Sequence, residues 1–133
     1  MSVSAPQVDA SLLFAAFTDG LAQDRLMLQR CEACGTVQLG HIRCDACLGR
    51  SLTWVPSTGR GCIHTFAVVH RAYHPAFAER VPYPVGFVEL DDGPRIAGGF
   101  AIERAQLHAG LRVRIAWDRS GPALPLCFVE DAA

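Results

Sequence analysis

The sequence predicts a mainly β protein in which a short helix and a four-cysteine ribbon precede a small closed barrel or sandwich. Four of the six cysteines form two C-x2-C pairs, and nine residues separate the pairs, as in metal-binding ribbons. The chain after them contains short runs rich in β-branched and aromatic residues, and turn-forming sequences divide these runs at regular spacing. That arrangement is typical of small all-β domains.

The composition narrows the class of protein. Half of the 133 residues are hydrophobic and 19% are charged, which allows a buried core. The formal net charge of -1 gives no general attraction to nucleic acid or to anionic membranes. No apolar run approaches the roughly 18 residues of a membrane helix, and residues 1–7 lack the basic start of a secretory signal. We therefore expect a cytoplasmic protein with reduced cysteines, no membrane span and no nucleic-acid partner.

The first predicted element is a helix that begins near Ser11. Asp9 or Ser11 is a suitable N-cap, and Gly20 is expected to end the helix. The apolar residues with helical spacing are Leu12, Leu13, Phe14, Ala16, Phe17 and Leu21. This apolar stripe could pack on the chain's own core or on a partner. A short strand from about Leu26 to Arg30 should then lead into the first cysteine pair.

The two cysteine pairs are predicted to bind one metal ion. Cys31, Cys34, Cys44 and Cys47 supply four thiolates, and four thiolates complete a tetrahedral shell with no open position. The ion is therefore expected to be structural zinc, and Gly35 and Gly49 are expected to give each turn its permissive backbone. Iron in a rubredoxin-like site and a redox dithiol are the alternatives.

Six strands are predicted after the first cysteine pair. They cover Leu52–Val55, Cys62–Val69, Val85–Leu90, Arg95–Phe100, Leu111–Trp117 and Leu126–Val129. Asp92-Gly93 predicts a hairpin between the third and fourth of these strands. A short helical turn is expected within residues 103–108. The longest irregular segment is expected at residues 71–84, and a loop of this length is often functional.

Other chemistry is weakly indicated by the sequence. Cys62 and Cys127 stand alone within predicted strands, where buried free thiols are expected. The five histidines show no metal-binding spacing, and there is no Ser-His-Asp order, phosphate-binding glycine loop or paired-carboxylate signature. The sequence therefore predicts no catalytic residues in this chain.

The order of these features resembles a known family, the small zinc-ribbon plus OB-fold, acyl-CoA-associated proteins encoded beside thiolase-like enzymes in bacteria and archaea. The likeness covers about residues 11–130, and its most specific segments are Leu28–Cys31, Cys34-Gly35, Arg43-Cys44, Gly59–Gly61 and Val88–Arg95. Ile42 departs from the family, which usually has proline at this position. The four ligand positions are all kept.

The resemblance implies a fold of three parts and a role in an enzyme complex. The parts are an N-terminal helical segment over residues 1–28, a rubredoxin-like zinc ribbon over 29–53 and a five-stranded OB-fold barrel over 54–133. The role is that of a noncatalytic accessory subunit of a thiolase-superfamily acyltransferase, thiolase or aldolase that acts on acyl-CoA or acylated substrates. Its partner is a thiolase-like catalytic subunit, joined in some assemblies by a third subunit. The accessory subunit would stabilise the assembly and help form the channel for CoA.

Two segments are expected to contact the partner or CoA. The expected contact residues are Leu12, Phe14 and Phe17 in the helix, and Arg71, His74 and Arg80 in the irregular segment. A stand-alone acyl-CoA-binding protein or thioesterase is an alternative function, as is a single-stranded nucleic-acid-binding module.

Overall fold

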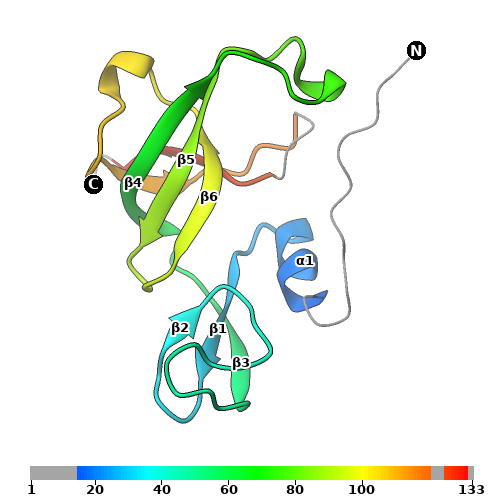
Figure 1. The fold of residues 1–133 in the computed structure, drawn as a ribbon, viewed down its shortest axis with the longest axis vertical. Helices are drawn as coiled ribbons and strands as arrows, with labels where there is room; N and C mark the ends of the chain where they lie inside the picture. The colour runs from blue at the N-terminus through cyan, green and yellow to red at the C-terminus, as the bar shows by residue number, and fades with distance from the viewer. Residues whose placement is uncertain (1–14, 121–124, 132–133) are drawn as a thin grey trace.

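The computed structural model describes residues 15–120 and 125–131 (Figure 1). In chain order the elements are α1 (Ala15–Ala22), β1 (Met27–Cys31), β2 (Val37–Gln38), β3 (Leu52–Pro56), β4 (Arg60–Val69), η2 (Pro75–Phe77), β5 (Tyr83–Leu90), β6 (Arg95–Phe100), η3 (Arg104–Gln106), β7 (Arg112–Ile115) and β8 (Cys127–Glu130). Figure 1 shows a strand-built upper part, a smaller lower sheet, and α1 beside the passage between them.

The smaller sheet contains three strands in the order β2-β1-β3. The central strand β1 pairs antiparallel with both neighbours. Cys31 is the last residue of β1 and lies opposite Leu52 of β3. This sheet therefore carries the first cysteine pair at one end and joins the rest of the molecule at the other.

The larger unit is a closed barrel with the strand order β4-β5-β6-β8-β7. β4 also pairs with β7, which closes the barrel, and β6–β8 is the parallel pair. This is the five-stranded OB-fold expected from the resemblance, and the mainly β fold class is confirmed. The proposed boundary between residues 53 and 54 falls inside β3 and stays a prediction.

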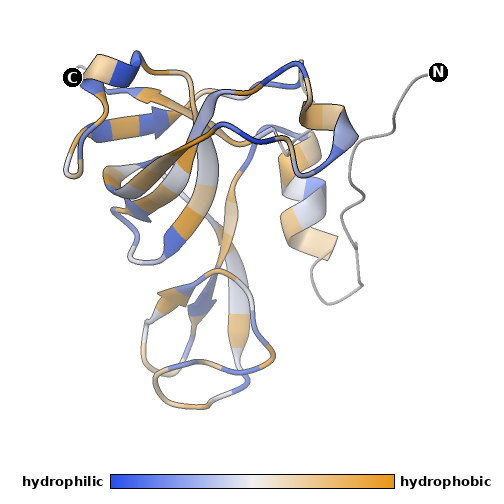
Figure 2. Cartoon of the chain, turned by 45° about the horizontal axis from the view of Figure 1, so that its top comes forward, coloured by the Kyte–Doolittle hydropathy of each residue, from blue (hydrophilic) through white to orange (hydrophobic). Residues whose placement is uncertain are grey.

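One hydrophobic core connects the two units. It joins Leu21, Leu26 and Leu28 of the N-terminal part to barrel residues such as Val88 and Phe128. Successive residues of a barrel strand point alternately to the core and to the outside. Figure 2 shows the corresponding change between hydrophobic and hydrophilic residues along these strands. Because the core is shared, the smaller sheet and α1 are packed against the barrel rather than tethered to it.

The helix does not end at Gly20, as predicted, but continues to Ala22. A Cβ atom on Gly20 would lie 2.7 Å from Cγ of Met27 and 2.8 Å from the carbonyl oxygen of Arg25. Glycine is therefore needed inside the helix because the chain folds back against it. The predicted caps Asp9 and Ser11 lie outside the described residues.

Most predicted strands are confirmed, with changes at their ends. β4 begins at Arg60 rather than Cys62. β5 begins at Tyr83 rather than Val85, so the irregular segment before it ends earlier than expected. It also contains the 3-10 turn η2. The β5–β6 hairpin is confirmed, with Gly93 at a φ of 127°, and the expected helical turn is η3.

Cys62 and Cys127 are partly buried, so the prediction of buried thiols is wrong. Each alternates with a buried neighbour, Ile63 in β4 and Phe128 in β8. The two-residue period of a strand therefore places both thiols on the outer side of the barrel wall. No helix among residues 15–120 and 125–131 is long and apolar enough to cross a membrane.

Gly61 and Gly99 offer a matched test of backbone packing. A Cβ atom on Gly61 would lie 2.2 Å from the carbonyl oxygen of Glu89, whereas the nearest atom to one on Gly99 is 3.9 Å away. We expect Gly61→Ala to lower the free energy of unfolding by about 3 kcal/mol, at the upper end of overpacking effects. Gly99→Ala should be neutral or stabilise by about 0.5 kcal/mol. Urea denaturation measures both values, and equal midpoints for the two variants would contradict the packing seen at Gly61.

Candidate functional site

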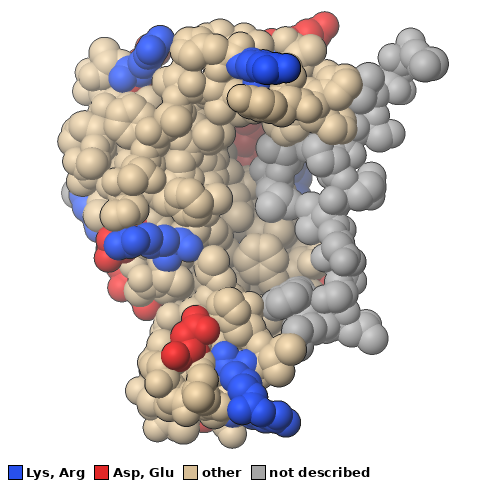
Figure 3. Space-filling model, in the orientation of Figure 1, with Lys and Arg blue, Asp and Glu red and all other residues tan. Residues whose placement is uncertain are grey.

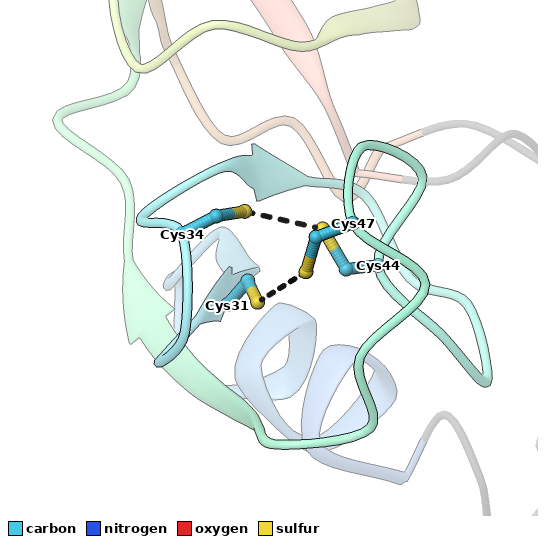
Figure 4. Close-up of side chains that lie close together, drawn as sticks. All are labelled: Cys31, Cys34, Cys44 and Cys47. Atoms are coloured by element: carbon cyan, nitrogen blue, oxygen red, sulfur yellow. Dashed lines mark hydrogen bonds between the residues drawn. The ribbon is translucent and has the colours of Figure 1, made fainter.

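The four paired cysteines meet at one point between two turns. Cys31 ends β1 and Cys34 lies in the turn that follows, while Cys44 and Cys47 lie in the facing loop (Figure 4). Their Sγ atoms all lie within 4.8 Å of one another. The short contacts cross between turns, at 3.6 Å for Cys31–Cys47 and 3.5 Å for Cys34–Cys44. The sulfurs therefore form one cluster rather than two separate pairs.

The two turns place different residue types in the left-handed conformation. Gly35 has a φ of 79° and donates its amide to the carbonyl of Cys31 at 2.8 Å. In the second turn Leu48 takes this position, with a φ of 63°, and donates to the carbonyl of Cys44 at 2.9 Å. The prediction that Gly49 supplies the permissive backbone is therefore wrong. A left-handed leucine costs about 1 kcal/mol, which indicates that the surrounding contacts impose this turn.

Gly49 has a different role, which is to leave room for sulfur. A Cβ atom at this position would lie 3.2 Å from Sγ of Cys47 and 3.9 Å from Sγ of Cys31. The backbone of Gly49 also accepts a hydrogen bond from the amide of Cys44 at 2.8 Å. This glycine therefore closes the second turn while keeping a side chain out of the cluster.

Two buried glutamines hold the loop that carries the second cysteine pair. Gln29 in β1 and Gln38 in β2 are 3% and 4% exposed, and the Gln38 amide donates to Oε1 of Gln29 at 3.1 Å. Oε1 of Gln29 accepts from the amide of His41 at 2.8 Å, and Oε1 of Gln38 accepts from the amide of Asp45 at 3.0 Å. These two side chains therefore fix both flanks of Cys44. Sequence reasoning missed them, because a polar residue in a strand predicts an exposed position.

The thiol pKa values diverge when the cluster holds no cation. Hydrogen bonding with the side chain and backbone of Thr36 lowers the pKa of Cys34 to about 6. The amide of Gly49 lowers the pKa of Cys47, but the other three cysteines and burial outweigh it and raise that pKa to about 11. Four neighbouring thiolates repel one another, so full ionisation of the cluster requires a cation.

The cluster has the shape of a tetrahedral metal site. A zinc–sulfur distance of about 2.3 Å implies about 3.8 Å between sulfurs in a regular tetrahedron, close to the two crossed contacts of 3.6 and 3.5 Å. Cys31 and Cys44 are buried and Cys34 and Cys47 are exposed. In the described part of the chain this is the one group of three or more His, Cys, Asp or Glu side chains placed to hold a metal.

The structure describes four of the six expected contact residues, Phe17, Arg71, His74 and Arg80. Phe17 is partly buried and packs against the core. The guanidinium of Arg71 lies 5.5 Å from the ring centre of Tyr73. Nδ1 of His74 accepts a hydrogen bond from the amide of Ala76 at 3.0 Å and caps η2. Leu12 and Phe14 lie outside the described residues, so the whole set stays a prediction.

Arg80 lines a groove on the outside of the barrel. The groove has a volume of about 550 Å³ and is walled by η2, β5, β6 and the start of β8. Phe77 and Tyr83 stack at its edge, with ring centres 5.7 Å apart, and Phe87 lies on its floor with 49% of its surface exposed. The groove therefore combines an aromatic wall with one cationic side chain, Arg80, and one carboxylate, Asp118.

The fold recurs in known proteins. A family model described as ChsH2, C-terminal OB-fold domain, matches residues 54–118. The chain is similar to the solved Ltp2-ChsH2(DUF35) aldolase, with 30% identity, a TM-score of 0.78, and coverage of 94% of this chain and 98% of that chain. A DUF35-family protein of unknown function from Sulfolobus solfataricus shares the fold, with 13% identity, a TM-score of 0.66, and coverage of 91% and 87% of the two chains.

Two curated relatives are longer than this chain. A probable enoyl-CoA hydratase alpha subunit of Thermomonospora curvata is 33% identical over 121 residues, which cover 89% of this chain and 37% of the relative. A DUF35 domain-containing scaffold protein of Methanocaldococcus jannaschii is 34% identical over 71 residues, which cover 52% of this chain and 50% of the relative. The match thus spans a third to a half of these relatives' length. This chain belongs to the DUF35/ChsH2 family. The family is shown by the near-complete overlap with the DUF35 chain of known structure, together with the barrel and the four-cysteine ribbon.

Proposed function

We propose that this chain is a noncatalytic, zinc-binding scaffold subunit of a thiolase-superfamily complex that acts on acyl-CoA or acylated substrates. The observation that carries the proposal is the likeness, over 98% of its length, to a DUF35 chain solved as part of an aldolase. The scaffold name of the Methanocaldococcus relative agrees with this role. The Thermomonospora relative is named as an enoyl-CoA hydratase subunit. A hydratase is a different kind of enzyme from an aldolase, but its substrate is also an acyl-CoA.

The proposed ion is zinc, held by Cys31, Cys34, Cys44 and Cys47. The donor set supports it, since four thiolates with tetrahedral spacing suit zinc, and reduced thiols persist in the cytoplasm where we place the protein. Zinc at this position supplies charge neutralisation and a cross-link between the two turns. The four thiolates would leave no open position on the ion, so the ion would have no catalytic role. Under this proposal the catalytic residues belong to the partner subunit.

The outer face of β4, β5 and β6 is our proposed contact surface for the thiolase-like partner. Figure 3 shows this face as mainly uncharged, with arginines and acidic side chains at its margins. Phe87 is 49% exposed on this face, whereas Phe66 follows Thr65, the partner of Phe87, and so points to the other side of the sheet. A large exposed aromatic side chain on an uncharged face is typical of protein interaction sites. Arg80 borders this face in the groove, and Arg71 and His74 lie in the same connection between β4 and β5.

A stand-alone acyl-CoA-binding protein is the second candidate, and the groove favours it. Its volume of about 550 Å³ falls within the range of small-molecule sites, and its lining is mainly apolar, with Arg80 and Asp118 as its charged side chains. Under the scaffold proposal the same groove lies at a site shared with the partner, where it contributes to the CoA channel.

Removal of a cysteine ligand tests the metal. We expect Cys44→Ser to lose the bound zinc and to lower the thermal unfolding midpoint, because the ion links the two turns. Cys62→Ser is the matched control, since Cys62 lies in β4 outside the cluster. It should keep one zinc per chain. Elemental analysis with thermal unfolding measures both effects, and loss of zinc from both variants would contradict the assignment.

Co-purification tests the scaffold role. We expect the chain to form a stable complex when it is co-expressed with a thiolase-like protein encoded beside it. Phe87→Asp should reduce the recovered complex at least about tenfold, because the charge must be desolvated at the interface. Ala105→Asp is the control, since it places the same charge on the exposed turn η3.

The scaffold proposal is wrong if the parent chain co-purifies no better than an unrelated protein. If the complex forms equally well with both aspartate variants, the partner binds another surface. Calorimetric titration of the parent chain alone with acetyl-CoA examines the second candidate.

A further inference from the structure

A second cavity lies at the junction between the smaller sheet and the barrel. It has a volume of about 320 Å³ and is lined by the connection from α1 to β1, the connection from β3 to β4, and β7. Three arginines line it, Arg25, Arg60 and Arg114, and Trp117 adds an aromatic surface. This cavity is separate from the cysteine cluster and shares no lining residue with the groove that contains Arg80.

Two of the three arginines have no partner in the described part of the chain. The side chains of Arg25 and Arg114 make no hydrogen bond or ion pair with residues 15–120 or 125–131. Nε of Arg60 lies 3.8 Å from Oδ2 of Asp131, which is a loose pairing. The acidic residue of the lining, Asp24, is paired with Arg119 instead. The cavity therefore has an excess of positive charge.

The strand register brings two of these cations together. Arg60 of β4 lies directly opposite Arg114 of β7, and like charges in directly opposed positions of a sheet repel each other. Arg112, on the same strand as Arg114, has a complete counter-ion: both of its terminal nitrogens donate to the Asp91 carboxylate at 2.7 Å. In the Arg60–Arg114 pair, Arg60 has the loose contact with Asp131, while Arg114 has no counter-ion among the described residues. A like-charge pair in a cavity, with one member unpaired, indicates an anion site.

We propose that this cavity binds a phosphate monoester, and that under the proposed function this group is the 3′-phosphate of an acyl-CoA. Asp131 offsets one of the three arginine charges, so two remain, and a phosphate monoester carries close to two negative charges at neutral pH. Guanidinium groups bind phosphate through paired hydrogen bonds. The hydroxyl of Thr58 and the surface of Trp117 line the same cavity and are suited to the adjoining nucleoside. The hydroxyl of Ser57 instead donates to Oδ2 of Asp92 and accepts from the amide of Gly59.

A comparison of CoA with dephospho-CoA isolates this phosphate, because the two ligands differ only in the 3′-phosphate. In calorimetric titrations of the full zinc-loaded chain, we expect CoA to bind at least about tenfold more tightly than dephospho-CoA. Arg114→Gln should weaken CoA binding about 10- to 100-fold, as expected for a lost charge-assisted hydrogen bond, and should hardly change dephospho-CoA binding. Arg104→Gln removes the same charge from η3, outside the cavity, and should change neither affinity.

Stability gives a second readout for the same variant. Without ligand, Arg114→Gln should unfold at the same temperature as the parent or a few degrees higher, because it removes the repulsion with Arg60. A structural role for Arg114 would lower the midpoint instead. Arg25→Gln repeats the affinity measurement on the other unpaired cation, so the test does not depend on one variant.

The phosphate site is refuted if CoA and dephospho-CoA bind equally, or if Arg104→Gln weakens CoA binding as much as Arg114→Gln. Adenosine 3′,5′-bisphosphate, which lacks the pantetheine arm, should compete with CoA, and failure to compete would also refute it. The site and the scaffold role can fail separately. A chain that co-purifies with its partner but does not discriminate between the two ligands keeps the scaffold role alone. A chain that discriminates but does not co-purify keeps the phosphate site alone.

Discussion

The convergence of four sulfurs at the end of β1 is the constraint on which the rest of the structure depends. β1 carries Cys31 at one end, while its Leu28 is 0% exposed in the core that the barrel shares. A segment as small as the ribbon cannot bury enough apolar surface to fold alone. The proposed metal cross-link at one end and barrel packing at the other would therefore stabilise the same strand from both directions.

The same constraint explains why the metal centre and the recognition surfaces are separate. Four thiolates leave no coordination position for a substrate, so binding must occur where the barrel and the junction present other groups. The structure provides two such places, an apolar groove over β5 and β6 and a basic cavity beside β7. One suits a protein or an acyl chain and the other an anion, which is the combination that the proposed acyl-CoA role requires.

The sequence predicted whatever depends on local pattern, and it did not predict what depends on long-range contacts. The clustering of the four cysteines and the Asp92-Gly93 hairpin were predictable because spacing and turn preference are local properties. Gly20 was misread as a helix end, because the chain that packs against it arrives only at Met27. The buried Gln29–Gln38 pair and the facing positions of Arg60 and Arg114 appear only once strand register is known. Register is a tertiary property, and a shift of one residue would turn these side chains to the other face.

The junction is where the two halves of the chain act as one site. Arg119, from the segment after β7, donates to the carbonyl oxygen of Leu21 at 2.6 Å and pairs with Asp24, which ties the end of α1 to the barrel. The basic cavity is built from this junction, since Arg25 precedes β1 and Arg60 begins β4. β1 and β3 are in turn held by the turns that the cysteines join. The positions of these arginines therefore depend on the ordered ribbon, so the proposed metal, although distant from the cavity, would help to shape the proposed phosphate site.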